Sequence, residues 1–432
     1  MADYVLKLRT AIRGGSSFGS LNMKNFTGFK DIEICFDDFK TNSFRTVPEI
    51  QESWSPLISF KENANASIDA CNPLFLLQML ENENDDTIPF TSILNAPYHR
   101  KLVCFQSGYF SSDFDLTNAQ TDASDFQKIN TIKKYYSKWD QLTKSKKLQF
   151  FSLLMQLSFH QEALNLIKDT NLQNQQKLDL HLYYETARCI HRIHPQTDLA
   201  NQILFQLLNT SNNWIIQFSS VIQLISLNCR TANDLSTAFR FISKGQQLLS
   251  GQKSSLKSWQ HHLLLSRYHR VVALYFVLMK NIEQVFFHME LAFQNSEKIN
   301  QLSAEKPELI QQYADENLKI CLESMVKLHA NLKSKDGLQY VERLVAHENN
   351  SPHAYLCIGD FFEAIGQSEQ AANALHKSAL GGGGRAAGSA FRAAMLYQDN
   401  SQSNQAEQCL ELACSLNPTA GKICHDEFNL SN

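Results

Sequence analysis

The spacing of apolar residues divides this chain into two parts near residue 125. From about residue 128 onward, apolar residues recur every three or four positions, which is the spacing of amphipathic helices. Short polar joints separate these segments, and consecutive helices joined in this way pack antiparallel. The pattern therefore predicts a series of up-down helix pairs over residues 129–432. Clear helical segments are residues 147–157, 161–168, 178–193, 199–208 and 214–227.

Residues 1–128 have a different residue pattern, in which short apolar runs alternate with turn-forming residues. Several of these runs alternate apolar and polar residues as strands do. Strand candidates are residues 4–9, 31–36, 57–60 and 102–105, whereas residues 73–81 (PLFLLQMLE) predict a helix. We predict a small α+β or β-rich N-terminal domain, followed by an acidic polar linker at residues 111–124.

A repeated order of small and large residues is visible near the C-terminus. One unit has Tyr355, Ile358, Gly359 and Phe362 on its first helix, Gly366 at the turn, and Ala371, Leu375, Ser378 and Ala379 on its second helix. The order recurs about 35 residues later as Ala394, Tyr397, Ala406, Leu410 and Ala413, followed by Pro418. A looser copy has Ala273, Phe276, Met289 and Ala292, with Lys280 and Val285 where glycine and alanine are usual.

This order and period resemble the tetratricopeptide repeat, which has about 34 residues per helix pair. The resemblance covers roughly residues 145–420 by architecture but only 352–420 by motif. It implies a mainly α fold, a right-handed α-solenoid whose first helices line a concave groove. The alternative is a generic helical domain in which the spacing arose by chance.

The resemblance also implies a function, because such stacks bind extended peptides or partner helices. We therefore expect a scaffold that recognises a protein or peptide partner through the first helices. The expected partner-binding residues are Arg267, Arg270 and Leu274 in the central copy, His353, Leu356, Asp360 and Glu363 in the next, and Phe391, Met395 and Gln398 in the last. The alternative is an enzyme, or an accessory subunit of one, whose N-terminal domain acts on a substrate that the repeats present.

Composition narrows the choice of partner and compartment. The net charge of −3 gives no electrostatic reason to expect nucleic acid. No apolar run reaches the roughly 18 residues of a membrane helix, and the first residues lack the apolar core of a signal peptide. The ten cysteines are scattered, which favours reduced thiols and a cytoplasmic location. No cofactor motif is present.

Two local clusters could carry chemistry. Gly381–Gly384 before Arg385 could present backbone N–H groups to an anion, but no strand precedes it and no P-loop lysine follows, so a joint between repeats is favoured. Cys189, His191 and His194 include a histidine pair that zinc can use, yet no further ligands lie nearby in sequence. We therefore predict no metal site.

A basic, partly aromatic face admits two interpretations. It consists of Trp259, His261, His262, Arg267, Tyr268, His269 and Arg270. These side chains could recognise an acidic peptide or a phosphate, or they could fill an interface between repeats. The aspartates at 113, 115, 122 and 125 do not match a calcium loop and predict a solvated linker. Asp37-Asp38 and His99-Arg100 are the polar pairs to test for catalysis.

Overall fold

The structure is a computed structural model, and it describes about three fifths of the chain as helices and short turns. No strand occurs among these residues. The described residues are 79–82, 131–132, 134–156, 160–167, 179–193, 198–232, 234–251, 257–303, 308–348, 351–380 and 386–416. The predicted strands of the N-terminal domain and the linker lie outside these ranges. Of the predicted helix at residues 73–81, residues 79–81 are described, and they are helical.

The helical part is built from successive helices with short connections. From its N-terminal side, this part contains η5 (Trp139–Gln141), α7 (Lys144–Gln156), α8 (His160–Asn165), α9 (Leu180–Ile193), α10 (Leu199–Thr210), α11 (Trp214–Leu227), η6 (Asn228–Ala232) and α12 (Leu235–Ser250). They are followed by α13 (Ser258–Leu278), α14 (Ile282–Ser303), α15 (Glu308–Leu332), η7 (Lys335–Gly337), α16 (Leu338–His347), α17 (Pro352–Ala364), α18 (Ser368–Leu380), α19 (Ala386–Asp399) and α20 (Ser403–Leu416). The helices predicted between residues 147 and 227 are confirmed, with ends shifted by at most three residues.

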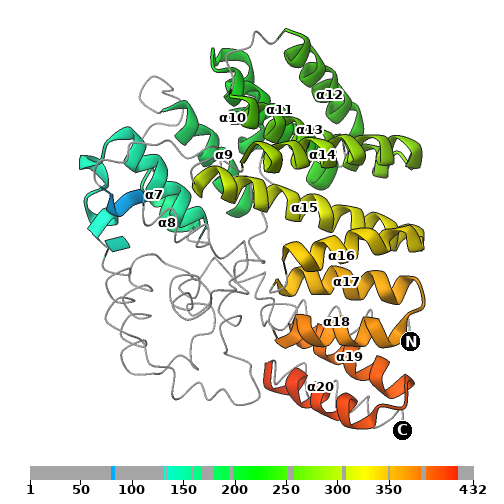
Figure 1. Cartoon of the computed structure of the whole chain (residues 1–432). Helices are drawn as coiled ribbons and strands as arrows, with labels where there is room; N and C mark the ends of the chain where they lie inside the picture. Colours follow the sequence, from blue (N-terminus) through cyan, green and yellow to red (C-terminus); the bar gives the residue numbers. More distant parts are fainter. Residues whose placement is uncertain are drawn as a thin grey trace.

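Most helices pack mainly against their neighbours in the sequence, and α15 also packs against α17. The closest pairs are α13 with α14, α17 with α18, α18 with α19, and α19 with α20. Figure 1 shows α15 to α20 lying one beside the next, from yellow to red. Buried apolar side chains form clusters that follow this order, one shared by α14, α15, α16 and α17 and another by α17 to α20. The prediction of a mainly helical protein with many packed helices is therefore confirmed.

A short N-terminal segment packs onto the beginning of the helical part. Met79 and Leu80 are buried in the same apolar cluster as α7. The Lys146 ammonium is buried and donates hydrogen bonds to the carbonyls of Met79 and Asn82, at 2.6 Å each. The Tyr135 hydroxyl donates to the Leu80 carbonyl. These bonds satisfy carbonyls at a helix end, which otherwise have no partner in the helix.

Four helix pairs reverse direction through the same turn. The first helix of each pair is followed by a residue with positive φ: Lys280 (56°), Lys333 (52°), Gly366 (78°) or Ser401 (61°). The N–H of the next residue, Asn281, Ser334, Gln367 or Gln402, donates to the carbonyl five residues back. This is the Schellman arrangement that ends many helices. The shared turn aligns the pairs α13/α14, α15/α16, α17/α18 and α19/α20 residue by residue. The turn at Lys333 lies 33 residues before the turn at Gly366, which lies 35 residues before the turn at Ser401.

The small residues predicted to let paired helices approach do lie at contact points. A Cβ added at Gly359 would lie 2.7 Å from the side chain of Leu375, so α17 and α18 are closer here than an alanine would allow. Ala371 on α18 is fully buried. Overpacking such a site forces side chains or backbone to move, which is why a larger residue is excluded.

The pair formed by α15 and α16 was not recognised in the sequence. The first helix of this pair, α15, extends over 25 residues. Its turn has Lys333 where Gly366 lies in the next pair, so the glycine signal is missing. Among the described residues, no helix combines the length and apolarity needed to cross a bilayer.

The shared turn makes a testable prediction about stability. A non-glycine residue in the left-handed region is strained by roughly 1–2 kcal/mol, and glycine is not. We expect Ser401→Gly to stabilise the protein and Gly366→Ser to destabilise it, each by about 1 kcal/mol, as measured by thermal unfolding followed by circular dichroism. Gly251→Ser is the matched control, because Gly251 has an ordinary φ of −88° at the end of α12. Equal effects at residues 366 and 251 would contradict the argument.

Candidate functional site

The aligned turns place the sequence-predicted residues at equivalent positions on the first helices. The count starts at the residue that follows each positive-φ residue, namely Asn281, Ser334, Gln367 or Gln402. Eleven residues before these lie Arg270, Glu323, Leu356 and Phe391. Counting back 7 residues gives Leu274, Lys327, Asp360 and Met395. We call the side of α13, α15, α17 and α19 that carries these positions the first-helix face. Glu323 and Lys327 occupy it although the sequence did not single them out.

The ten predicted partner-binding residues differ in exposure. Arg267, His353, Leu356 and Phe391 are buried, Arg270, Leu274, Met395 and Gln398 are half-buried, and Asp360 and Glu363 are exposed. The buried four contribute to packing between helices. The exposed or half-buried six are open to contact with another molecule.

An ion-pair cluster joins two of the first helices. Arg392 on α19 lies 2.8 Å from a carboxylate oxygen of Asp360 and also pairs with Glu363, both on α17. Burial opposes the charge of the Arg392 guanidinium, but the two carboxylates more than offset this effect, so the pKa of Arg392 is raised above its ordinary value. Because these groups lie 29 and 32 positions apart in sequence, their contact fixes α17 beside α19.

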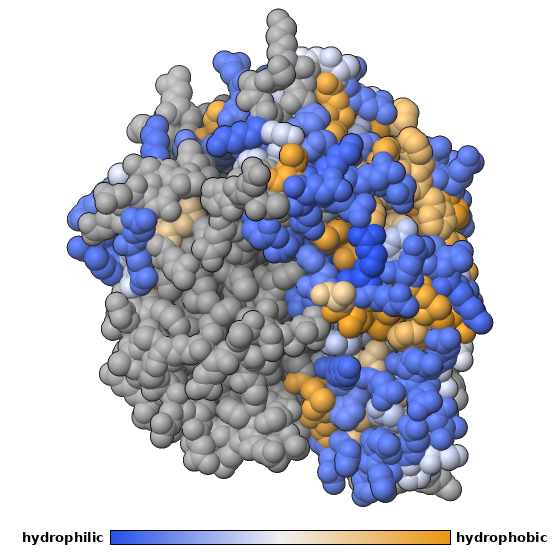
Figure 2. All heavy atoms as spheres, in the orientation of Figure 1, coloured by the Kyte–Doolittle hydropathy of each residue, from blue (hydrophilic) through white to orange (hydrophobic). Residues whose placement is uncertain are grey.

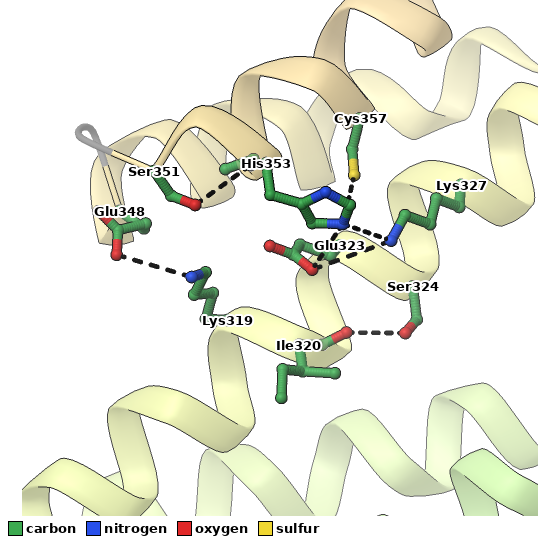
Figure 3. Close-up of polar contacts among 10 residues, drawn as sticks. Lys319, Ile320, Glu323, Ser324, Lys327, Glu348, Ser351, His353 and Cys357 are labelled. Carbon is green, nitrogen blue, oxygen red and sulfur yellow. Dashed lines mark hydrogen bonds and ion pairs between the residues drawn. The ribbon is translucent and has the colours of Figure 1, made fainter. Parts of the chain in front are cut away.

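A buried polar cluster lies between α15 and α17 (Figure 3). The His353 Nε2 atom lies 2.9 Å from the Lys327 Nζ, 3.4 Å from the Cys357 Sγ and 3.6 Å from a Glu323 carboxylate oxygen. The Lys327 Nζ lies 3.9 Å from the same carboxylate. Glu323, His353 and Cys357 are buried, whereas the Lys327 side chain is 45% exposed. The four residues therefore surround one point from two helices.

Local sequence explains how α17 presents His353 and Cys357. Ser351 caps the helix by accepting a hydrogen bond from the N–H of Ala354, and Pro352 occupies the first helical position. Both features favour a helix that begins here. His353 and Cys357 are then four residues apart and lie on the same side of α17. Lys319 and Glu348 form a second buried pair nearby, 3.9 Å apart.

The protonation of the cluster follows from its hydrogen bonds. An ammonium group has only donors, so Lys327 donates and His353 Nε2 accepts, which places the imidazole proton on Nδ1. Burial raises the pKa of the Cys357 thiol to about 12, although Lys327 opposes the shift. Cys357 is therefore a neutral thiol at physiological pH, and it is not an activated nucleophile.

The basic, partly aromatic face of α13 is largely internal. Trp259, Arg267 and Tyr268 are buried, and the Tyr268 hydroxyl donates to the carbonyl of Ile242 on α12. His269 contacts His288 on α14, with 3.0 Å between their Nδ1 atoms. These contacts favour packing between helices over recognition of a phosphate.

The other sequence candidates are placed only in part. Cys189 is buried and His191 half-buried on α9, whereas His194 lies outside the described residues. The glycine tract at Gly381–Gly384 falls between α18 and α19 and is also outside them. The same holds for the aspartates of the linker and for Asp37-Asp38 and His99-Arg100.

Exposed apolar side chains gather at one edge of the structure. Orange surface lies over the region of α12 to α14 in Figure 2. The large apolar residues exposed there are Phe239, Val277, Leu278, Met279, Ile282 and Phe287, between 37% and 55% exposed. We call this set the α13/α14 apolar edge. Exposed patches of this kind often mark protein contacts.

The comparisons with known proteins give no relative from which to transfer a role. No protein-family model matches the chain, and no curated protein does.

The sequence pattern did not reveal the buried cluster between α15 and α17, because it lacked a signal for α15. It predicted His353 as a partner-binding residue, and it did not single out Cys357. Had Lys333 been recognised as a left-handed turn residue, the count back from Ser334 would have placed Glu323 and Lys327 beside Leu356 and Asp360.

The half-buried histidines His269 on α13 and His288 on α14 predict how the stability of the protein varies with pH. Burial, and to a smaller extent His288, lower the pKa of His269 to about 4. Because the unfolded chain binds this proton more readily, the contribution of a neutral His269 is complete above its ordinary pKa of 6.5. It decreases as the pH falls from 6.5 toward 4.

We expect the free energy of unfolding to decrease over this range, by up to about 1.4 kcal/mol per pH unit from His269 alone. In His269→Gln, which does not titrate, the slope of stability against pH should be smaller. Urea unfolding at several pH values measures both slopes. Identical slopes for the variant and the parent protein would contradict the assignment.

Proposed function

We propose that this protein is a helical-repeat binding module. In this proposal α13 to α20 form a right-handed α-solenoid of the tetratricopeptide type, and the first-helix face holds an extended segment of a partner protein. The observation that supports the proposal is the left-handed turn shared by four helix pairs, which gives their first helices a common register relative to the turn.

The spacing of the turns supports the solenoid. Consecutive turns separated by 33 and 35 residues match the period expected of this repeat family. In a solenoid each unit contacts mainly the next one, and the helices here pack mainly against sequence neighbours. The ion pairs of Arg392 with Asp360 and Glu363 join the first helices of two consecutive units directly.

The charge on the first-helix face indicates what kind of segment it would bind. Asp360 and Glu363 are 46% and 47% exposed, and within the described part of the chain both pair with one cation, Arg392. One carboxylate charge is therefore not balanced within this cluster. A lysine or arginine of a partner would pair with it, while the half-buried Met395 and Gln398 offer apolar contact and hydrogen bonding. The proposed occupant is a peptide segment with basic side chains.

The thiol chemistry supports a cytoplasmic setting for this role. The six cysteines within the described helices, including Cys189, Cys321 and Cys409, are free thiols. Reduced thiols are typical of the cytoplasm. The enzyme alternative depends on residues 1–128, of which only 79–82 are described, and it stays a prediction.

Selection from a displayed library of random peptides on the full-length protein tests the proposal. We expect the enriched peptides to carry lysine or arginine. The double variant Asp360→Lys/Glu363→Lys should weaken their binding at least about tenfold, because it replaces attraction by repulsion. Because Asp360 and Glu363 also pair with Arg392 on α19, circular dichroism must show that the double variant keeps its helical content before a loss of binding is assigned to the first-helix face.

A matched control is Glu407→Lys/Glu411→Lys on α20, which makes the same change in charge at exposed positions of a second helix. This variant should bind the peptides normally. If no peptide is enriched, or if both double variants bind equally well, the proposal fails. If binding is instead lost in Met279→Glu/Phe287→Glu, the contact surface is the α13/α14 apolar edge and the first-helix face is not the site.

A further inference from the structure

The buried cluster between α15 and α17 has the composition of a metal site. Glu323, His353 and Cys357 each direct one ligand atom to a common region, and the three atoms lie within 4.8 Å of one another. They come from two helices whose packing holds them in place. This cluster is distinct from the Cys189, His191 and His194 group that the sequence suggested.

Two of the three distances between the ligand atoms fit a tetrahedral ion. With metal–ligand distances of about 2.0–2.3 Å, the ligands of a tetrahedral zinc ion lie roughly 3.3–3.8 Å apart. The observed separations are 3.4 Å between Cys357 Sγ and His353 Nε2, and 3.6 Å between His353 Nε2 and Glu323. The His353 and Cys357 pair has the four-residue helical spacing that zinc sites use.

A cation, the Lys327 ammonium, already lies beside two of the three potential ligands. The Lys327 ammonium lies 2.9 Å from the nitrogen of His353 and 3.9 Å from the carboxylate of Glu323. Its side chain is 45% exposed, whereas the three potential ligands are buried. Lys327 can therefore rotate toward solvent and leave the site to another cation without any change in α15 or α17.

We propose that Glu323, His353 and Cys357 bind a divalent transition-metal ion, Zn²⁺ by preference, in exchange for the Lys327 ammonium. Sulfur, imidazole and carboxylate ligands together favour zinc over magnesium or calcium, which prefer oxygen alone. On binding, a bond forms between the metal and Cys357 Sγ, and the thiol proton is released to solvent. A water molecule would complete four ligands. The ion would fasten α15 to α17 and so set the angle between two first helices.

This inference does not depend on partner binding, and it is tested on the full-length protein after removal of metal with a chelator. Titration calorimetry with zinc chloride measures affinity and stoichiometry. Cobalt chloride reports the ligands, since a thiolate bound to Co²⁺ gives a charge-transfer absorption in the near ultraviolet. We expect one zinc ion per chain that is lost in Cys357→Ser, and a cobalt–thiolate absorption that is lost with it.

Two variants separate a metal site from a purely structural network. Lys327→Met removes the competing ammonium, and we expect it to bind zinc more tightly than the parent protein. Cys321→Ser is the control, because Cys321 is also a buried thiol on α15 but belongs to no ligand group found in the described residues. It should bind normally.

The metal proposal would be overturned by any of three results. These are no zinc binding by both the parent protein and Lys327→Met, undiminished zinc binding by Cys357→Ser, or a cobalt complex without thiolate absorption. The last result decides the question even if Cys357→Ser fails to fold, because it uses the parent protein alone.

Discussion

The left-handed residue that follows each first helix is the constraint on which the C-terminal half depends. One residue with positive φ ends the helix and directs the chain back along it, and the next N–H satisfies an otherwise open carbonyl. Because the reversal takes so few residues, the two helices must lie antiparallel and close. Gly359 meets this demand by leaving room for Leu375. The same constraint gives every first helix the same register relative to its turn.

Charged groups inside the structure determine which helices meet. Arg267 on α13 is buried, and burial lowers its pKa to about 9 although Tyr184 and Glu316 raise it. It therefore remains cationic at neutral pH, where Glu316 on α15 supplies Coulomb attraction. Lys319 and Glu348 make a comparable buried pair between α15 and the residue after α16. A buried charge is costly unless it is paired, and a paired one adds little net stability. A wrong helix pairing would leave such a charge unpaired, so these groups act mainly by disfavouring wrong pairings.

The two proposals concern neighbouring parts of one surface. Lys327 lies at the position on α15 that Asp360 occupies on α17, and it is the exposed member of the buried cluster. Release of Lys327 by a metal ion would move a positive charge from the cluster to the first-helix face. Metal binding would then alter the charge that a basic partner segment meets, which links the two sites through one side chain.

The sequence by itself determined the helices and part of their pairing, because apolar spacing and turn residues are local signals. It placed Gly366 at a turn and Gly359 at a close contact, and both are there. It also placed Asp360 and Glu363 on one helix face, but it could not show that Arg392 joins them, since that contact bridges two helices.

Tertiary structure alone decided the buried cluster. Glu323 and Cys357 are 34 positions apart, and nothing local relates them. The turn at Lys333 carries no glycine, so α15 could not be aligned with α17 from the residue pattern. Only the packing of the two helices brings a carboxylate, an imidazole and a thiol within reach of one ion, because side-chain chemistry converges in space and not along the chain.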